Sequence, residues 1–270
     1  MAQPTPLPDR EGVQTAARKA DHLRINLEED VAAKGVRTGF EAYRFMHCAL
    51  PEIDLADVTT QTEVLGWHLR SPLFISCMTG GTERAHRINC VLAETAEEAG
   101  IALGLGSGRV LLERPAALAT FAVRQLAPSV PLLANMGAVQ LNRGVTASDC
   151  ARLVDMLGAD ALVLHLNPLQ EALQPEGDTC FGGLLARIEE TVAQLDVPVI
   201  VKEVGWGISP DLVACLVASG VAAVDVAGAG GTSWSEVERY RITEPWRARV
   251  AAPGASAAPG PGGGRARCRR

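Results

Sequence analysis

Six short apolar runs, each ending in small or polar residues, divide the chain from residue 73 onward. They recur roughly every 25 to 37 residues, which is the length of a strand followed by a helix. Each run is apolar almost throughout, as strands buried on both faces are. We therefore predict parallel strands at 73–77, 102–105, 132–134, 161–164, 199–201 and 222–226.

The segments between these runs have apolar residues three or four positions apart, as on one face of a helix. This spacing is clear in 88–99 and 184–195. Thr146 and Asp149 resemble a capping box, and Pro210 after Ser209 is typical of a helix start. The alternation predicts an α/β fold of the (β/α)8 TIM barrel family, with an open doubly wound sheet as the alternative.

The number of units and the end of the chain set the predicted boundaries. A closed barrel needs eight β-α units, and we count about six. Residues 254–270 contain no Leu, Ile, Val, Phe or Met, and we interpret the change near Pro253 as a frameshift or truncation. We expect a disordered N-terminus at 1–14, a helical or cap segment at 15–72, a partial barrel at 73–252 and a disordered Gly/Pro/Arg tail at 253–270.

Composition narrows the class of protein. The 270 residues are 47% hydrophobic, enough for one large core, and the net charge of −6 argues against a general nucleic-acid-binding protein. The seven cysteines form no CxxC pair, and Cys77, Cys90 and Cys215 lie in apolar segments, so we expect reduced thiols in a cytoplasmic protein. No apolar run is long enough to span a membrane, and we expect no membrane partner.

Polar residues are concentrated directly after the fourth run. His165 and Asn167 are two positions apart, so a strand would direct both to one side, and Pro168 then turns the chain. Gln170 and Glu171 are expected on the loop that leaves the carboxyl end of the strand. Ligands of α/β folds bind at that end, so these residues are candidates for a site.

A helix is expected at 15–34, and it carries several cationic or titratable residues. Arg18, Lys19, His22 and Arg24 lie close together before an acidic stretch at 28–30. A solvated helix face is the simple explanation of such a cluster. The alternative is an arm that closes over an anionic substrate.

Seven motifs occur in order along the chain, at 18–22, 78–81, 106–109, 134–137, 165–171, 201–205 and 227–234. They read RKADH, MTGG, GSGR, ANMG, HLNPLQE, VKEVG and AGAGGTSW. Together they resemble the type 2, FMN-dependent isopentenyl-diphosphate delta-isomerases, over about residues 15 to 252. One such motif is a weak signal, whereas seven in the same order are specific.

The resemblance implies interconversion of isopentenyl diphosphate and dimethylallyl diphosphate in isoprenoid biosynthesis, by reduced-flavin acid–base catalysis. It implies FMN, NADPH and Mg²⁺ as cofactors, and a homo-tetramer or octamer. The implied catalytic residues are His165, Asn167 and Gln170, and the implied Mg²⁺ ligand is Glu171. The implied substrate contacts are Arg18, Lys19, Ser107, Gly108, Arg109, Gln170 and Trp234. The implied FMN contacts are Met78, Thr79, Gly80, Ser107, Asn135, Lys202 and Thr232.

Structural explanations stay open for single residues. Taken alone, Lys202 is equally explained by pairing with Glu203 or Asp225, and Asn135 by capping of a turn. A tryptophan such as Trp234 is more often a core residue than a ligand contact. Taken alone, the glycines from 228 to 231 are more simply explained by a tight strand-to-helix turn.

The chain also departs from the family pattern. Position 108 is Gly where Gln is common, and residues 254–270 contain no counterpart of the family's Gly-Gly-Ile-Arg-type loop for the FMN phosphate. One alternative is therefore an inactive truncated remnant that does not bind FMN. A second alternative is an FMN-dependent 2-hydroxy-acid oxidase, which would need a His base and a carboxylate-binding Arg near the chain end.

Overall fold

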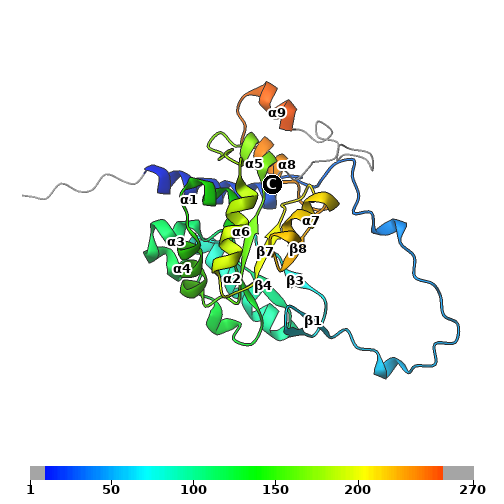
Figure 1. Cartoon of the computed structure of the whole chain (residues 1–270). Coiled ribbons are helices and arrows are strands. Elements are labelled where there is room, and N and C mark those ends of the chain that lie inside the picture. Colours follow the sequence, from blue (N-terminus) through cyan, green and yellow to red (C-terminus); the bar gives the residue numbers. More distant parts are fainter. Residues whose placement is uncertain (1–9, 252–270) are drawn as a thin grey trace, which may run out of the picture.

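The fold is built on one sheet of six parallel strands, which follow one another across it in sequence order (Figure 1). The computed structural model describes residues 10–251. The strands are β3 (Phe74–Ile75), β4 (Ala102–Gly104), β5 (Leu132–Gly137), β6 (Ala161–His165), β7 (Val199–Lys202) and β8 (Ala223–Asp225). A doubly wound sheet reverses its strand order at a switch point, and this sheet does not. The structure therefore confirms the predicted barrel-type α/β architecture, with β3 and β8 at the two edges.

Helices between the strands cover the outer face of the sheet, and further helices lie at one end of it. The helices in residues 10–251 are α1 (Arg10–Glu28), α2 (Glu83–Ala99), α3 (Arg109–Glu113), α4 (Ala147–Leu157), α5 (Pro168–Leu173), α6 (Leu184–Gln194), α7 (Pro210–Ala218), α8 (Trp234–Arg239) and α9 (Pro245–Ala251). Both predicted helix starts are present. The Thr146 hydroxyl accepts from the Asp149 N–H at 3.2 Å in a full capping box, and Ser209 caps α7.

The core lies on both faces of the sheet, because side chains of successive strand residues point to opposite faces. Leu132, Leu162 and Leu164 belong to the large cluster that the sheet shares with the helices. Leu133 and Val163 belong to a smaller cluster on the inner face, the side that a barrel encloses. The inner face is therefore apolar before the carboxyl ends of the strands, and polar side chains begin near those ends.

A hairpin of β1 (Thr62–Val64) and β2 (Trp67–Leu69) lies at the opposite end of the sheet. Trp67 packs against the small inner cluster. The Arg70 N–H donates to the Gly100 carbonyl at 2.9 Å, immediately before β4 begins. The hairpin therefore covers the amino-terminal ends of the strands, whereas α1, α5 and α8 gather at the other end (Figure 1).

The first helix differs from the predicted 15–34, because it begins at Arg10 and ends at Glu28. The chain after it is pulled out of the helix by pairing with a distant segment. Ala32 and Thr232 form an antiparallel bridge, and the Ser233 N–H donates to the Val31 carbonyl at 2.8 Å. Residues 1–9 and 252–270, which include most of the predicted disordered N-terminus and the predicted tail, lie outside the described part of the chain.

A long segment between α1 and β1 swings away from the body of the molecule (Figure 1). It contains two short 3₁₀ turns, Phe40–Ala42 and Leu55–Asp57. Several of its large apolar side chains are exposed, among them Phe40, Tyr43, Phe45, Met46, Leu50 and Leu55. Such a run of exposed apolar groups is typical of a surface that another protein segment covers.

The cysteines partly follow the prediction. Cys77 and Cys150 are buried free thiols, and burial raises the pKa of each to about 12, which makes them unreactive. Cys215 is disulfide-bonded, so the expected reduced thiol is wrong at this position. The absence of CxxC spacing excludes only disulfides between cysteines that are close in the sequence. It carries no information about disulfides between cysteines that are far apart in it. Within residues 10–251 no helix combines the length and apolarity that crossing a bilayer requires.

Candidate functional site

One row of residues crosses the carboxyl ends of four neighbouring strands. Gly137, His165, Lys202 and Asp225 are in register on β5, β6, β7 and β8. Residues an even number of positions apart on a strand face the same side of the sheet. Gly137, His165 and Lys202 each lie an even number of positions after a residue of the small inner cluster on the same strand, and Asp225 is in register with Lys202. All four therefore face the same side as that cluster. Asn135, two residues before Gly137, belongs to the same face. The structure thus brings three predicted residues, Asn135, His165 and Lys202, to one end of the inner face.

His165 is held by Asn135 and kept neutral. Its Nδ1 lies 3.1 Å from the Asn135 Oδ1, and a Cβ at position 137 would lie only 3.2 Å from its Nε2, so glycine there leaves room for the ring. Burial, helped by the nearby positive charge of Lys202, lowers the pKa of His165 to about 3. A phosphate contact from His165 would therefore come from a neutral ring N–H.

Replacing His165 by Gln is expected to make the stability of the protein less sensitive to acid. The pKa in the folded state lies below the unfolded value of about 6.5, so the unfolded chain takes up the proton first. The wild type therefore loses stability as the pH falls from about 6.5 towards 3, by at most about 1.4 kcal/mol per pH unit. Urea unfolding at about pH 7.5 and about pH 5.5 should show a drop roughly 1 kcal/mol smaller in the variant. Equal drops would contradict the assignment.

Lys202 is 4% exposed, and its ammonium group donates to the main-chain oxygen of Glu203 at 2.7 Å. The carboxylate of Glu203 accepts instead from the N–H groups of Gly205 and Gly207. The side-chain pair between Lys202 and Glu203, one of the structural explanations, is therefore not formed. Lys202 is the last residue of β7, where its Cα is in register with that of Asp225 on β8.

The polar residues after β6 lie on a helix, which corrects the predicted loop. Asn167 is the N-cap residue of α5, and Pro168 occupies its first position, where the fixed backbone angle of proline favours a helix start. Asn167 is 3% exposed. Its amide nitrogen donates to Gln170 Oε1 at 3.2 Å and to Glu171 Oε1 at 2.8 Å. One buried amide thus orients both side chains.

The other end of the Gln170 amide is held by α8. Its nitrogen donates to Glu238 Oε1 at 3.0 Å, and the His22 Nε2 lies 2.9 Å from the same oxygen. Glu238 is completely buried, and Arg241 donates to its second oxygen at 2.8 Å. Burial alone would raise the pKa of Glu238, but the hydrogen bonds from His22, Gln170 and Arg241 outweigh it and hold the pKa below its usual value.

Glu171 has the features of a ligand for one metal ion shared with a substrate. One of its oxygens accepts from Asn167 and the other from the Asp178 N–H at 2.6 Å, so the carboxylate is fixed in place. No group of three or more His, Cys, Asp or Glu side chains in residues 10–251 is arranged so that it could hold a metal ion by itself. Mg²⁺ needs few protein ligands when a substrate supplies phosphate oxygens, so a single oriented carboxylate fits such an ion.

Lys19, on α1, lies within a group of cationic side chains. Burial first, and then the positive charges of Arg18, Arg109 and Arg114, lower the pKa of Lys19 to about 8. Its ammonium group also lies 5.6 Å from the centre of the Phe121 ring. Positive charges held this close repel one another, and an anion bound among them would relieve the repulsion. The group therefore has the electrostatics of a phosphate site.

The loops after β3 and β4 meet at Thr79. Its carbonyl accepts from the Gly106 N–H at 2.8 Å and from the Asn89 amide at 3.1 Å. A Cβ at Gly106 would lie 2.3 Å from the Thr79 carbonyl carbon, and one at Gly80 would lie 2.2 Å from the Phe121 ring. Both glycines are therefore required by the close approach of other groups.

The remaining residues of these loops surround the row at the carboxyl ends. Ser107 is half-buried, and the Gly108 N–H donates to the Asn135 carbonyl at 2.8 Å. A Cβ at Gly108 would lie 2.6 Å from Leu153, so the Gln common in the resembling family would require that side chain to move. Met78 is 56% exposed, and nothing covers it within the described residues.

The loop after β8 is covered by the chain that follows α1, through the bridge between Ala32 and Thr232. The ring of Trp234 meets His22 edge-on, with centroids 5.2 Å apart. Trp234 also packs against the cluster formed by Ile25, Val31 and Val237. It is thus partly a core residue and partly a neighbour of the Gln170 network through His22.

Three residues of this site were missed by the sequence analysis: Glu238, Arg241 and Asp178. Glu238 lies on α8 and Arg241 lies in the turn that follows it. An acidic and a basic residue three positions apart just after the AGAGGTSW motif are a signal of an ion pair that the sequence offers. Asp178 lies 3.7 Å from Arg109 and 3.2 Å from Arg143, in a loop whose sequence has no such periodicity.

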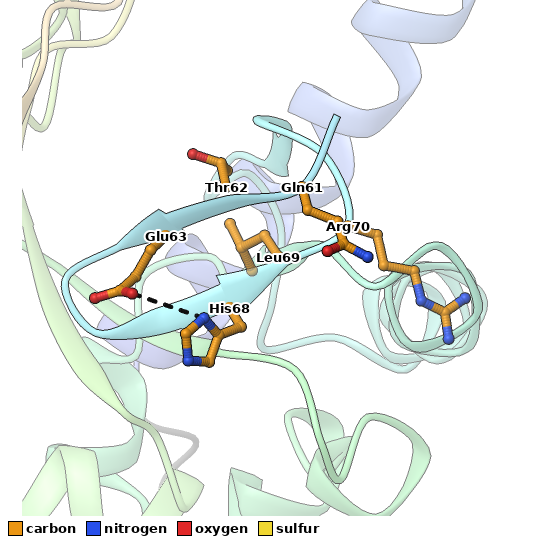
Figure 2. Close-up of a pocket in the computed structure, with 6 residues that line it drawn as sticks. All are labelled: Gln61, Thr62, Glu63, His68, Leu69 and Arg70. Atoms are coloured by element: carbon orange, nitrogen blue, oxygen red, sulfur yellow. Dashed lines mark ion pairs between the residues drawn. The ribbon is translucent and has the colours of Figure 1, made fainter. Parts of the chain in front are cut away.

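A surface pocket elsewhere does not belong to this site. Figure 2 shows its lining residues on the β1–β2 hairpin, where Glu63 and His68 form an ion pair at 3.7 Å. The other lining residues are Gln61, Thr62, Leu69 and Arg70. The hairpin covers the amino-terminal ends of the strands, so this pocket lies away from the polar row at the carboxyl ends.

Solved structures share the fold at low sequence identity. An active chimera of (S)-mandelate dehydrogenase aligns with a TM-score of 0.53 and 18% identity, over 85% of this chain and 74% of that one. A lactate oxidase of Pediococcus acidilactici aligns with a TM-score of 0.52 and 12% identity, over 82% of this chain and 66% of that one. These likenesses concern the α/β architecture alone.

Curated relatives are much more similar in sequence. The isopentenyl-diphosphate delta-isomerase of Synechococcus sp. is 58% identical over 233 residues, which are 86% of this chain and 67% of that protein. The enzyme of the same name from Rickettsia akari is 54% identical over 235 residues, 87% of this chain and 68% of that protein. No family model matches the chain. At this identity and coverage, the chain belongs to the isopentenyl-diphosphate delta-isomerase family.

Proposed function

We propose that this chain interconverts isopentenyl diphosphate and dimethylallyl diphosphate at the carboxyl ends of its strands. Relatives that are 54% and 58% identical are named for this reaction, which supports the assignment. The observation that carries it is the Gln170 amide, which is held at one end by Asn167 and at the other by Glu238. A fixed amide next to a cationic group is suited to a substrate with one charged end and one apolar end.

The diphosphate would bind among Arg18, Lys19 and Arg109. Arg109 lies 3.7 Å from Asp178, whose N–H in turn holds the Glu171 carboxylate, so the cations and the proposed Mg²⁺ ligand belong to one connected group. A phosphate oxygen and Glu171 would share the ion. Charge-assisted hydrogen bonds from arginine and lysine suit a diphosphate, and the backbone of Ser107 and Gly108 lies in the same loop.

The isoprenoid part would lie between Gln170 and Trp234, whereas His165 and Asn167 would contact the diphosphate. An isolated alkene is a very weak base, so its protonation requires an acid in a dry, apolar place. Gln170 is a poor proton donor, so its part is to orient the substrate. Trp234, half-buried against His22, would exclude water from the hydrocarbon.

FMN fits the inner face of the strand ends. The buried ammonium group of Lys202 and the amide of Asn135 face this side, and both are suited to an electron-rich ring. Met78, Thr79, Gly80, Ser107 and Thr232 lie on loops at the same end. When bound and reduced, FMN would supply the acid–base group for the double-bond shift, and NADPH would keep it reduced, with no net redox change. We extend the proposal to a homo-tetramer or octamer, supported by the exposed apolar side chains between α1 and β1.

Replacing Lys19 by Met is expected to weaken binding of isopentenyl diphosphate about 10-fold or more, because a charge-assisted contact contributes roughly 1.5–3 kcal/mol. Isothermal titration calorimetry with the substrate and Mg²⁺ measures the loss. The matched control is Arg24→Met, which removes an exposed cation from the same helix, where it pairs with Glu28 at 3.5 Å. Equal affinities of the wild type and the Lys19 variant would place the diphosphate elsewhere.

A further inference from the structure

Arg241 joins three separate segments behind the proposed site. Its guanidinium donates to Glu238 Oε2 and to Glu176 Oε1, both at 2.8 Å, and its Nε lies 3.8 Å from Asp21 Oδ2. The three carboxylates come from α8, from the loop after α5 and from α1. The Arg241 side chain is only 13% exposed. An ordinary surface ion pair involves neither this burial nor three partners.

The hydrogen bonds that lead from Arg241 to the proposed metal ligand have a fixed direction. Arg241 donates to Glu238, which accepts from Gln170, whose oxygen accepts from Asn167. Asn167 also donates to Glu171. An ionised carboxylate only accepts, so while Glu238 is ionised the Gln170 amide must present its nitrogen to α8 and its oxygen to Asn167.

We propose that Arg241 is a positioning residue, which holds Glu238 as an ionised, fixed acceptor and thereby sets the orientation of the Gln170 amide. This inference rests on the proposed function for its consequence in catalysis. The guanidinium of Arg241 donates to Glu238 and Glu176 and reaches Gln170 only through Glu238, so its role is positioning rather than catalytic.

The physical reason lies in the burial of Glu238. The carboxylate is 0% exposed, and without Arg241 its second oxygen would lose the cation that donates to it. A buried carboxylate that loses such a partner tends to take up a proton, and it then donates as well as accepts. Gln170 would then no longer be restricted to one orientation, and the substrate that it orients would be held less accurately.

The test compares Arg241→Gln with Arg239→Gln. Arg239 is a matched control, because it is the last residue of α8, two positions before Arg241, and pairs three positions away with another buried carboxylate, Glu236, at 2.9 Å. The first readout is the side-chain amide resonance of Gln170 in ¹⁵N-glutamine-labelled protein, assigned by its loss in Gln170→Ala. The second readout is kcat and KM for isopentenyl diphosphate with reduced FMN and Mg²⁺.

We expect the Gln170 amide resonance to shift in Arg241→Gln and to stay in place in Arg239→Gln. We expect kcat to fall about 10-fold to 100-fold in the first variant, with KM changed much less, because accurate placement acts on turnover. Arg241→Lys should restore part of both signals, since it returns a cation to Glu238. A similar fall of kcat in both glutamine variants, or an unmoved Gln170 resonance, would overturn the proposal.

The amide readout needs no substrate, so it separates this inference from the proposed function. A wild type that does not turn over isopentenyl diphosphate would overturn the proposed function, while the resonance would still decide the role of Arg241. If Arg241→Gln does not fold, Glu238→Gln takes its place in the same measurement, because it removes the ionised acceptor that Arg241 holds. A Glu238→Gln variant with an unchanged Gln170 resonance and unchanged kcat would then overturn the inference.

Discussion

Alanine in place of Gln170 is expected to lower the turnover of isopentenyl diphosphate about 100-fold while the protein stays folded, since misplacement of a substrate by about 1 Å has effects of this size. The Gln170 amide is held at both ends, by Asn167 at the start of α5 and by Glu238 on α8. Steady-state kinetics with reduced FMN and Mg²⁺ measure the loss, and far-UV circular dichroism checks the fold.

The control for this prediction is Gln125→Ala. Gln125 is an exposed glutamine in a short turn, so its replacement should leave turnover unchanged. Turnover of the Gln170 variant within about twofold of the wild type would show that substrate orientation does not depend on this amide, since that is a difference of only about 0.4 kcal/mol.

Alanine in place of Gly106 is expected to lower the free energy of unfolding by about 3 kcal/mol, the upper range for overpacking. The added Cβ would lie 2.3 Å from the carbonyl carbon of Thr79, so the two loops would have to separate. That movement would break the 2.8 Å hydrogen bond from the Gly106 N–H to the Thr79 carbonyl. Urea unfolding monitored by tryptophan fluorescence measures the change.

Gly182→Ala is the matched control, because nothing lies within 4 Å of the Cβ that it adds. Its effect should stay within about 0.5 kcal/mol, as for most surface substitutions. Equal effects of the two substitutions would mean that the close approach of the two loops does not contribute to stability and is not the reason why this turn contains glycine.

The sheet was predictable because buried parallel strands carry their signal in their own residues. The run at 161–164 contains only apolar residues and ends in His165, and β6 occupies Ala161–His165. The start of α4 was equally local, since Thr146 and Asp149 are the two halves of its capping box. The end of α1 was not local, because the pairing of Ala32 with Thr232 overrides the helical pattern that continues to residue 34.

The candidate site shows the same division. His165, Asn167, Gln170 and Glu171 could be singled out because they lie within seven positions of one another at one strand end. The orientation of the Gln170 amide could not be predicted, because it depends on Glu238, which is 68 positions away in the sequence. The neutral state of His165 likewise follows from its burial beside Lys202, which lies on the neighbouring strand and is distant in sequence.

The most direct test of the proposed function is to follow isopentenyl diphosphate by ¹H NMR in the presence of the purified protein, FMN, NADPH and Mg²⁺. FMN uptake is monitored in the same sample by the flavin absorbance spectrum. We expect that FMN binds and that dimethylallyl diphosphate appears, at a rate that falls when Gln170 is replaced. A folded protein that leaves isopentenyl diphosphate unchanged, whether or not it takes up FMN, would contradict the proposed function.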